Sequence, residues 1–270
     1  RSTPKPSSAA SDVYKRQLCD ITKNKSMKKK NQADNNNRDE FWIYGYHAVI
    51  AALKNPNRPK LRLVLSSTIS EDVEVLFKPE LISKSEIAQL LPQGALHQGI
   101  ALLTRQLPVN TLDSLLVNIE KQSIVVAIDS MDDPHNLGAI LRSSVAFGAD
   151  AVMITERNSP ELNGTVAKAA SGALDIIPVI KVTNISRSLE KLKNANYWCL
   201  GLDNNANTEL SNFDAGNRVV LILGSEGKGI RRLTKETCDH MVRIPISQHI
   251  SSLNVSVSAA IALHKISERL

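Results

Sequence analysis

The sequence contains few cysteines and no long apolar run, and each shortage excludes a class of protein. Cys19, Cys199 and Cys238 are the only cysteines in 270 residues. Their odd number does not suggest a disulfide framework, and their spacing is not that of a zinc site. No apolar run reaches the roughly 18 to 20 residues that span a bilayer, and residues 1–30 lack the apolar core of a secretory signal. We therefore expect a soluble intracellular protein with incidental thiols.

The composition points to folded domains and an anionic partner. Hydrophobic residues make up 42% of the chain, which fits one large or two ordinary globular domains. The net charge of +6 and the isoelectric point near 9.2 favour nucleic acid as the first candidate partner. Net charge carries no information about specificity.

The first forty residues differ from the rest of the chain. Residues 1–40 are rich in Ser, Asn and Lys and have almost nothing to bury, so we expect a disordered, solvated tail. Met27 is followed by a lysine run and resembles a native start. Residues 1–26 are therefore interpreted as an extension that does not belong to the gene product.

Two folded regions follow the tail. Residues 41–105 predict a small α/β domain, with a helix after a short entry and strands at 61–65 and 99–103. The Pro and polar content of residues 106–115 predicts a linker. Residues 116–270 predict an α/β domain whose parallel sheet is covered on both faces. Its expected strands are 124–128, 151–154, 175–179, 197–202, 219–223 and 241–244, and its expected helices are 137–147, 163–171, 185–194 and 259–266.

The first segment with chemical content follows the strand 124–128, which ends at Asp129. Pro134 and Asn136 fit a turn and a helix cap. The helix then carries Arg142 on an otherwise apolar surface of small residues, where a charged group needs a partner. A structural salt bridge with Asp129 or Asp132 explains Arg142 as well as a functional role does.

The second segment is a glycine-rich loop, Gly-Ser-Glu-Gly-Lys-Gly at 224–229, which directly follows the strand 219–223. Ligands bind at such carboxyl ends of parallel strands, so a phosphate-binding loop must be considered. The loop fits that function poorly because Gly229 stands where Ser or Thr is required, and Glu226 would repel phosphate. A glutamate among glycines suits recognition of a hydroxyl or an amine better.

The third segment is a polar run that leads into the C-terminal helix. Its Ser and Asn side chains exceed what one helix cap needs, which suggests a site. They are Ser251, Ser252, Asn254, Ser256 and Ser258. Loops at two adjacent strand ends could clasp a planar heterocycle. Taken singly, the glycines and serines are also explained by turns and caps.

Together these segments resemble the three motifs of the SpoU/TrmH branch of the SPOUT methyltransferases. The matching stretches are Asp-Pro-His-Asn-Leu-Gly-Ala-Ile-Leu-Arg at 133–142, Leu-Gly-Ser-Glu-Gly-Lys-Gly at 223–229, and Ile-Pro-Ile at 244–246 with Ser-Leu-Asn-Val-Ser at 252–256. The resemblance covers residues 40–270, since His-Gln-Gly at 97–99 and the small domain resemble that family's RNA-binding domain.

The resemblance implies a fold, a cofactor and an assembly. A C-terminal segment would thread a loop to form a trefoil knot. S-adenosylmethionine would lie in that knot, held by the backbone around Leu223, Gly224, Ile244 and Leu253. The cofactor site and the substrate arginine would be assembled across a homodimer interface, with no metal and no membrane.

The implied reaction is methylation of a guanosine ribose 2′-hydroxyl in 23S rRNA. Arg142 matches the family arginine that acts on this hydroxyl, either as a base or by orienting the hydroxyl or a phosphate. A guanidinium is normally protonated, so orientation is the easier role, and we leave both open. The remaining matches to family site positions are Asn136, Glu226, Ser252 and Asn254.

Some neighbouring residues are weaker candidates. His135 is explained by local hydrogen bonding in its turn, and His97 and His249 are weaker still. The cluster Lys228, Arg231 and Arg232 is expected either to grip RNA phosphates or to form a solvated helix start. A tRNA ribose methyltransferase and a noncatalytic ribosome assembly factor remain as alternatives. The bacterial cytoplasm is the expected setting, with an organellar homologue that has lost a transit segment as the alternative.

Overall fold

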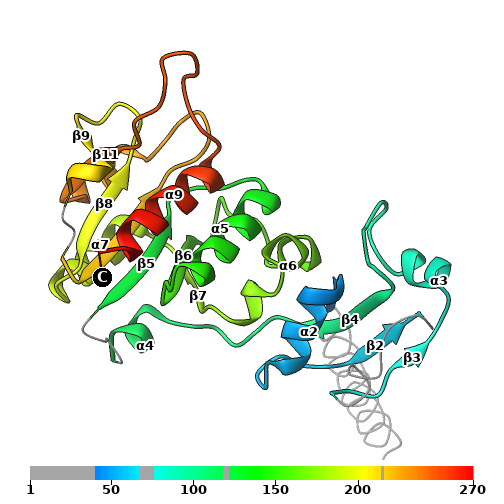
Figure 1. Cartoon of the computed structure of the whole chain (residues 1–270). Coiled ribbons are helices and arrows are strands. Elements are labelled where there is room, and N and C mark those ends of the chain that lie inside the picture. The colour runs from blue at the N-terminus through cyan, green and yellow to red at the C-terminus, as the bar shows by residue number, and fades with distance from the viewer. Residues whose placement is uncertain (1–39, 67–75, 118–121, 214–215, 270) are drawn as a thin grey trace, which may run out of the picture. The chain divides into compact units, whose positions relative to one another are not determined.

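The computed structural model describes residues 40–66, 76–117, 122–213 and 216–269. The predicted disorder of residues 1–40 lies almost wholly outside this part of the chain. The described residues form two separate sheets (Figure 1). No helix among them has the length and apolar content needed to cross a bilayer.

The first sheet is small and mixed. Its strand order is β1-β4-β2-β3, with β2 antiparallel to β4 and parallel to β3. Ser83 begins the second helix of this region with a capping box, in which its hydroxyl accepts from the backbone N–H of Glu86 and the Glu86 side chain accepts in return. The elements are β1 (Glu40–Tyr44), α2 (Tyr46–Lys54), β2 (Arg62–Leu65), β3 (Glu80–Leu81), α3 (Lys84–Gln89) and β4 (Ile100–Arg105).

The second sheet has seven strands in the order β7-β6-β5-β10-β8-β11-β9, and every pairing is parallel. The strands are β5 (Ser123–Ile128), β6 (Ala151–Thr155), β7 (Val179–Val182), β8 (Trp198–Leu202), β9 (Thr208–Glu209), β10 (Arg218–Leu223) and β11 (His240–Arg243). The helices are α4 (Leu112–Val117), α5 (Pro134–Ala146), α6 (Gly164–Ala170), α7 (Ile185–Asn194), α8 (Arg232–Thr237) and α9 (Val255–Ser267), with 3₁₀ turns η2 (Ala173–Asp175) and η3 (Leu210–Asn212).

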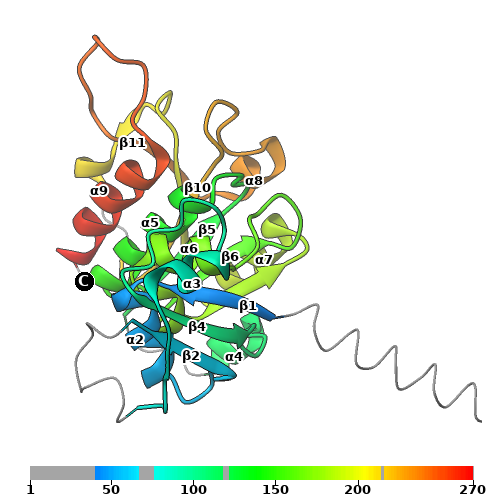
Figure 2. The same ribbon diagram turned by 90° about the vertical axis from the view of Figure 1, so that its right-hand side faces the viewer.

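Helices cover both faces of this sheet, which is why its central strands are apolar without alternation. In β5, Val125 and Ala127 pack with α4 and α7 on one face. Ile124, Val126 and Ile128 pack with α5, α6 and α9 on the other. Figure 2 shows α5 and α9 on one side of β10 and α7 on the opposite side. The predicted parallel sheet with helices on both faces is confirmed.

One predicted strand is wrong. Residues 175–179 do not form a strand, because Asp175 ends the turn η2 and the strand β7 begins only at Val179. The preceding helix α6 ends at its C-cap Ser171 with a φ of 51°, Gly172 follows with a φ of 97° and leads into η2, and Pro178 cannot donate a ladder hydrogen bond. The apolar residues between them therefore lie in a turn rather than in the sheet.

Two predicted helices begin earlier than expected. Helix α5 begins at Pro134 and is capped by Asp133, so Asn136 is not the cap but part of the first turn. Helix α9 begins at Val255, because the side chain of Asn254 accepts from two backbone N–H groups and caps it there. Helix α7 agrees with its predicted range, while α8 and the two-residue strand β9 were not predicted.

Asp175 holds the region of the small sheet against the turn η2. Its Oδ1 accepts from Nε of Arg58 at 2.7 Å and from Nδ2 of Asn55 at 3.2 Å. Both side chains of the ion pair are 1% exposed, and Asp175 Oδ2 has no hydrogen-bond partner among the described residues. A single carboxylate oxygen therefore neutralises a buried guanidinium.

Replacing Asp175 by Asn should destabilise the protein by roughly 3–5 kcal/mol, because Arg58 would remain as a buried charge without a counterion. The urea midpoint of unfolding, followed by circular dichroism, measures this loss. The matched control is Glu80→Gln, which breaks the ion pair with Arg62, where the side chains are 42% and 50% exposed. Similar midpoint shifts in the two variants would show that burial does not matter here.

Candidate active site

A polar cavity of about 580 Å³ opens at the carboxyl ends of β8 and β10 and beneath the segment that leads from β11 to α9. Its volume is in the range of sites for cofactors and other small molecules. Three loops contribute most of its lining. They supply Leu202, Asp203, Asn204 and Asn205, then Leu223, Gly224, Ser225, Glu226, Gly227, Lys228 and Gly229, then Ser251, Ser252, Leu253, Asn254 and Val255, and they are joined by Lys235 and Ser258.

Three side chains from distant segments form a closed hydrogen-bonded cluster at this cavity. Glu226 Oε1 accepts from Nδ2 of Asn254 at 2.9 Å and from Nδ2 of Asn136 at 3.2 Å. Nδ2 of Asn254 also donates to Oδ1 of Asn136 at 3.0 Å. The structure therefore brings together three of the predicted site residues, one from each motif.

Local structure explains how each asparagine reaches Glu226. The carboxylate of the cap residue Asp133 accepts the N–H of His135. The side chain of Asn136, on the first turn of α5, is therefore not needed as a cap and can bond to Glu226. Asn136 is 7% exposed. Asn254 uses Oδ1 to accept from the N–H groups of Ser256 and Val257, so its Nδ2 remains available. One amide thus caps α9 and joins the cluster at the same time.

The glycine-rich loop is a tight turn that requires glycine. A Cβ on Gly224 would lie 2.1 Å from the carbonyl carbon of Gly229, so no side chain fits. Ser225 and Gly229 exchange two backbone hydrogen bonds, and Gly227 adopts a φ of 86°. Residues 223–229 all line the cavity, three of them as glycines without a side chain.

Asp129 anchors the far end of the same loop. This carboxylate is fully buried at the end of β5 and accepts from the backbone N–H of Arg231 at 2.8 Å and from its Nη2 at 2.6 Å. The hydroxyl of Thr234 adds a bond of 3.0 Å. The hydrogen bond to Asp129 raises the pKa of the Arg231 guanidinium, while burial opposes the rise. The loop is therefore tied to the strand that neighbours β10.

The structure separates Arg142 from these contacts. Arg142 is exposed on α5 and makes no ion pair or hydrogen bond within the described residues. The alternative of a structural salt bridge with Asp129 is wrong, because Arg231 takes that carboxylate, and none forms with Asp132 either.

The other predicted residues divide between the cavity and its surroundings. Gly224, Ser252 and Leu253 line the cavity with Leu223 and Lys228, whereas Ile244 packs partly buried against the core. Of the predicted basic cluster, only Lys228 lines the cavity. Arg232 forms an exposed ion pair with Glu236 at 2.6 Å.

Two charged cavity residues escaped the sequence analysis. Asp203 follows β8 directly, and it forms an ion pair with Lys235 of α8. The strand 197–202 was predicted, so its carboxyl end could have been searched for a ligand-binding side chain in the same way as the ends of its neighbours. Lys235 offered no such signal, since the short helix that carries it was not predicted.

The histidines and thiols contribute little to this site. His97 accepts the N–H of Gly99 through Nδ1, and its pKa is lowered by burial and by nearby Lys84. Burial raises the pKa of Cys199 and of Cys238 to about 12, so both remain protonated. Among the described residues, no group of three His, Cys, Asp or Glu side chains is placed to hold a metal ion.

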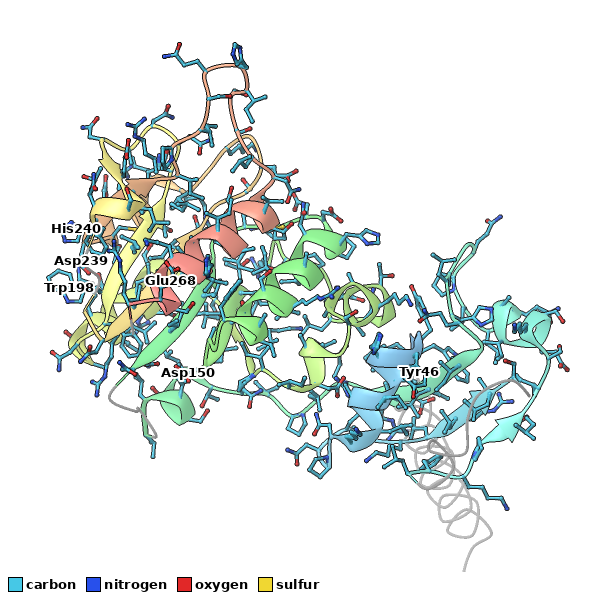
Figure 3. All side chains as sticks on the ribbon, in the orientation of Figure 1. Tyr46, Asp150, Trp198, Asp239, His240 and Glu268 are labelled. Atoms are coloured by element: carbon cyan, nitrogen blue, oxygen red, sulfur yellow. The ribbon has the colours of Figure 1, made fainter. Side chains whose placement is uncertain are left out.

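An aromatic cluster lies at the other end of the strands. Trp198 begins β8 and His240 begins β11, with ring centroids 5.6 Å apart (Figure 3). The ring of Phe213 lies 4.6 Å from that of His240. Because the strands are parallel, these amino ends face away from the cavity, and the cluster is not part of the site.

Comparison with known families identifies the two regions of the chain. Residues 123–264 match the model of the SpoU rRNA methylase family, and residues 42–109 match the RNA 2′-O ribose methyltransferase substrate-binding domain. The chain belongs to the SpoU family of RNA 2′-O-methyltransferases. The resemblance of the three motifs is thereby confirmed.

Relatives of this SpoU protein match more than four fifths of its length. It is 38% identical over 234 residues to the 23S rRNA (guanosine-2′-O-)-methyltransferase RlmB of Pseudomonas aeruginosa, covering 83% of this chain and 94% of the relative. It is 34% identical over 238 residues to a putative TrmH family tRNA/rRNA methyltransferase of Staphylococcus epidermidis, covering 84% and 95%.

Solved structures show the same fold. The SpoU methyltransferase AviRb of Streptomyces viridochromogenes, crystallised with AdoMet, aligns with a TM-score of 0.73 at 19% identity, covering 87% of this chain and 92% of that one. A crystal structure described as an RNA 2′-O ribose methyltransferase aligns with a TM-score of 0.74 at 22% identity, covering 87% and 90%.

Replacing Asp129 by Asn in this SpoU protein should loosen the glycine-rich loop, because the Arg231 guanidinium would lose its charged acceptor. Amide hydrogen exchange in residues 224–231 should become roughly tenfold to a hundredfold faster, as expected for losing one or two bonds to a charged group. The control is Glu236→Gln, which removes an exposed ion pair nearby. Unchanged amide exchange in Asp129→Asn would mean that the loop stays ordered without its contacts to Asp129.

Proposed function

We propose that the protein methylates the ribose 2′-hydroxyl of a guanosine in 23S rRNA with S-adenosylmethionine as the methyl donor. The observation that carries this proposal is the cluster of Asn136, Glu226 and Asn254 at the cavity, in which each motif contributes one side chain. The 38% identity to the RlmB enzyme supports the choice of guanosine in 23S rRNA.

The cavity fits S-adenosylmethionine in size and in chemistry. About 580 Å³ accommodates a nucleoside with an amino-acid tail, and Gly224, Gly227 and Gly229 line the cavity without side chains that would obstruct a flat ring. We assign contacts with the nucleoside to the backbone around Leu223, Gly224, Ile244 and Leu253. When bound, this cofactor supplies a methyl group on a positively charged sulfur.

The protein residues must position a weak nucleophile. A ribose hydroxyl reacts only when it is held in line with the methyl group and when the negative charge that develops on its oxygen is stabilised. Arg142 is exposed and unpaired among the described residues, so its guanidinium is free to bind that oxygen or the adjacent phosphate. We assign it the orienting role, and assign to Asn136, Glu226, Ser252 and Asn254 the holding of the ribose and the loops.

We further propose that the active unit is a homodimer in which Arg142 serves the partner's cavity. Asn136 and Arg142 are six residues apart on α5, which separates them by about 9 Å along the axis and about 240° around it. One helix therefore points them in different directions. Val257 and Ile261, which are 47% and 40% exposed on the neighbouring helix α9, offer an apolar contact surface for a second copy.

The family's trefoil knot is also part of the proposal. Strand β11 lies between β8 and β9, which precede β10 in the chain, and α9 returns to pack on α5 and β10. Nδ2 of Asn204 donates to the carbonyl of Ser251, which joins the two crossing segments. Tracing residues 198–267 in an experimental structure tests the knot, since a chain that could be pulled straight would contradict it.

For the small sheet we propose delivery of the RNA. Residues 41–105 would form the substrate-binding domain and residues 106–115 its linker to the methyltransferase domain of residues 116–270, in agreement with the family model that matches 42–109. Lys228, on the exposed tip of the glycine-rich loop, would contact an RNA phosphate beside the cavity.

Methyl transfer from tritium-labelled S-adenosylmethionine tests the function. Unmodified 23S rRNA and a tRNA pool are offered separately, and the labelled nucleoside is then identified. We expect 2′-O-methylguanosine from rRNA. Label in tRNA alone would select a tRNA ribose methyltransferase, and no label in either, despite cofactor binding, would favour a noncatalytic role in ribosome assembly.

Arg142→Ala should lower methyl transfer at least about a hundredfold by removing a group that stabilises the reacting oxygen. Cofactor affinity, measured by calorimetry, should stay close to that of the unchanged protein, because Arg142 does not line its own chain's cavity. Normal turnover in this variant would refute the assignment.

Coexpressing two inactive variants tests the shared site. Asn254→Asp keeps the oxygen that caps α9 but places a second carboxylate against Glu226, so its own cavity should fail. If Arg142 acts across the interface, random pairing with Arg142→Ala leaves about a quarter of the sites intact, and activity should return to about that level. Without such recovery, Arg142 acts within its own chain.

A further inference from the structure

Asp203 and Lys235 form a charged pair in the wall of the cavity. Asp203 directly follows β8, the strand that lies between β10 and β11, and Lys235 comes from α8. Both residues line the cavity. The pair therefore lies between the glycine-rich loop and the segment that leads to α9.

The main chain at Asp203 does not need this ion pair. Its N–H donates to the carbonyl of Val242 at 2.9 Å, and its carbonyl accepts the N–H of Ala206 at 3.0 Å. Its Oδ1 also accepts the N–H of Asn205 at 2.9 Å, a bond that an asparagine oxygen can replace. The side chains of Asp203 and Lys235 are 15% and 41% exposed, and ion pairs with such exposure add little stability. The structural value of the pair is therefore small.

Asp203 remains ionised within the cavity. Burial opposes its ionisation, but the hydrogen bonds from Lys235 and from the N–H of Asn205 outweigh burial and hold its pKa below the usual value. A carboxylate and an ammonium group thus stand next to each other, and both face a space that admits a ligand.

The other charged groups of the cavity are placed differently. Glu226 uses Oε1 to hold the two asparagines, and Lys228 lies on the exposed tip of its loop. The methyl donor is neutral at its adenine and ribose, which suit main-chain groups. It carries an ammonium and a carboxylate on one carbon at its amino-acid end, and such a zwitterion pairs in alternation with an adjacent Asp and Lys.

We propose that Asp203 and Lys235 bind the amino-acid end of the methyl donor, with Asp203 taking its ammonium and Lys235 its carboxylate. This inference rests on the proposed function, since it concerns the same cavity. It gives the site a means of distinguishing the complete cofactor from nucleosides that lack the amino acid.

Calorimetric titration with two ligands tests the proposal. S-adenosylhomocysteine contains the amino-acid end, whereas 5′-methylthioadenosine keeps the nucleoside and lacks that end. In Asp203→Asn and in Lys235→Met, the affinity for S-adenosylhomocysteine should fall about tenfold to a hundredfold, and that for 5′-methylthioadenosine should change less than about threefold. Glu236→Gln, one residue further along α8, should leave both affinities unchanged.

The outcomes separate the two claims. An equal loss of affinity for both ligands would mean that the pair contacts the nucleoside or maintains the shape of the cavity. No loss of affinity for either ligand would mean that the pair has no role in binding. Either result overturns the inference while the proposed function stands. Failure of the unchanged protein to bind either ligand would overturn the function and the inference together. The exchanged variant, Asp203→Lys with Lys235→Asp, retains a brace between β8 and α8, so recovery of S-adenosylhomocysteine binding there would show that the pair serves only as a brace.

Discussion

The carboxylate of Glu226 determines the geometry of the site, because segments that are distant in sequence meet on one of its oxygens. It receives the amides of Asn136 and Asn254, and these two asparagines also bind each other. Removing Glu226 or Asn254 leaves a polar atom of the buried Asn136 amide without its partner, which costs more than one bond contributes, whereas Glu226 and Asn254 themselves are exposed. The start of α5, the glycine-rich loop and the start of α9 therefore depend on one another.

The order of the strands makes this meeting inevitable. Strand β10 lies between β5 and β8, and β8 in turn pairs with β11, all in parallel. Every carboxyl end thus opens at the same edge, and the loops that follow are neighbours whatever their separation in the chain. Asp129, at the end of β5, then fixes the far end of the loop after β10 through Arg231. The parallel sheet brings the loops close together, and the hydrogen bonds of the buried Asp129 fix the position of the loop after β10.

Sequence patterns predicted the sheet, and the family resemblance implied that the three motifs share one site, but neither predicted the pairing of individual charges. The central strands were recognisable because strands covered on both faces are apolar throughout. The partner of Asp129 could not be recognised from the sequence, because helical periodicity places Arg142 on α5 but does not say which cation reaches a buried carboxylate. The strand expected at 175–179 failed for a related reason. Two isoleucines there suggested a strand, while the turn at Gly172 and the contact of Asp175 with Arg58 are tertiary effects.

The ion pairs of Arg231 and Arg232 also limit which cations near the cavity are available to bind a phosphate. Of the three basic residues in and just after the glycine-rich loop, Arg231 is bound by Asp129 and Arg232 by Glu236. Lys228 alone remains for a phosphate at the cavity. Inside the cavity two acidic residues, Asp203 and Glu226, balance Lys228 and Lys235. A balanced cavity suits a ligand with charges of both signs, whereas a polyanion is attracted by unbalanced cations. Under the proposed function we therefore expect the RNA phosphates to be attracted mainly by residues outside the cavity, while the cavity itself takes the methyl donor and the reacting ribose.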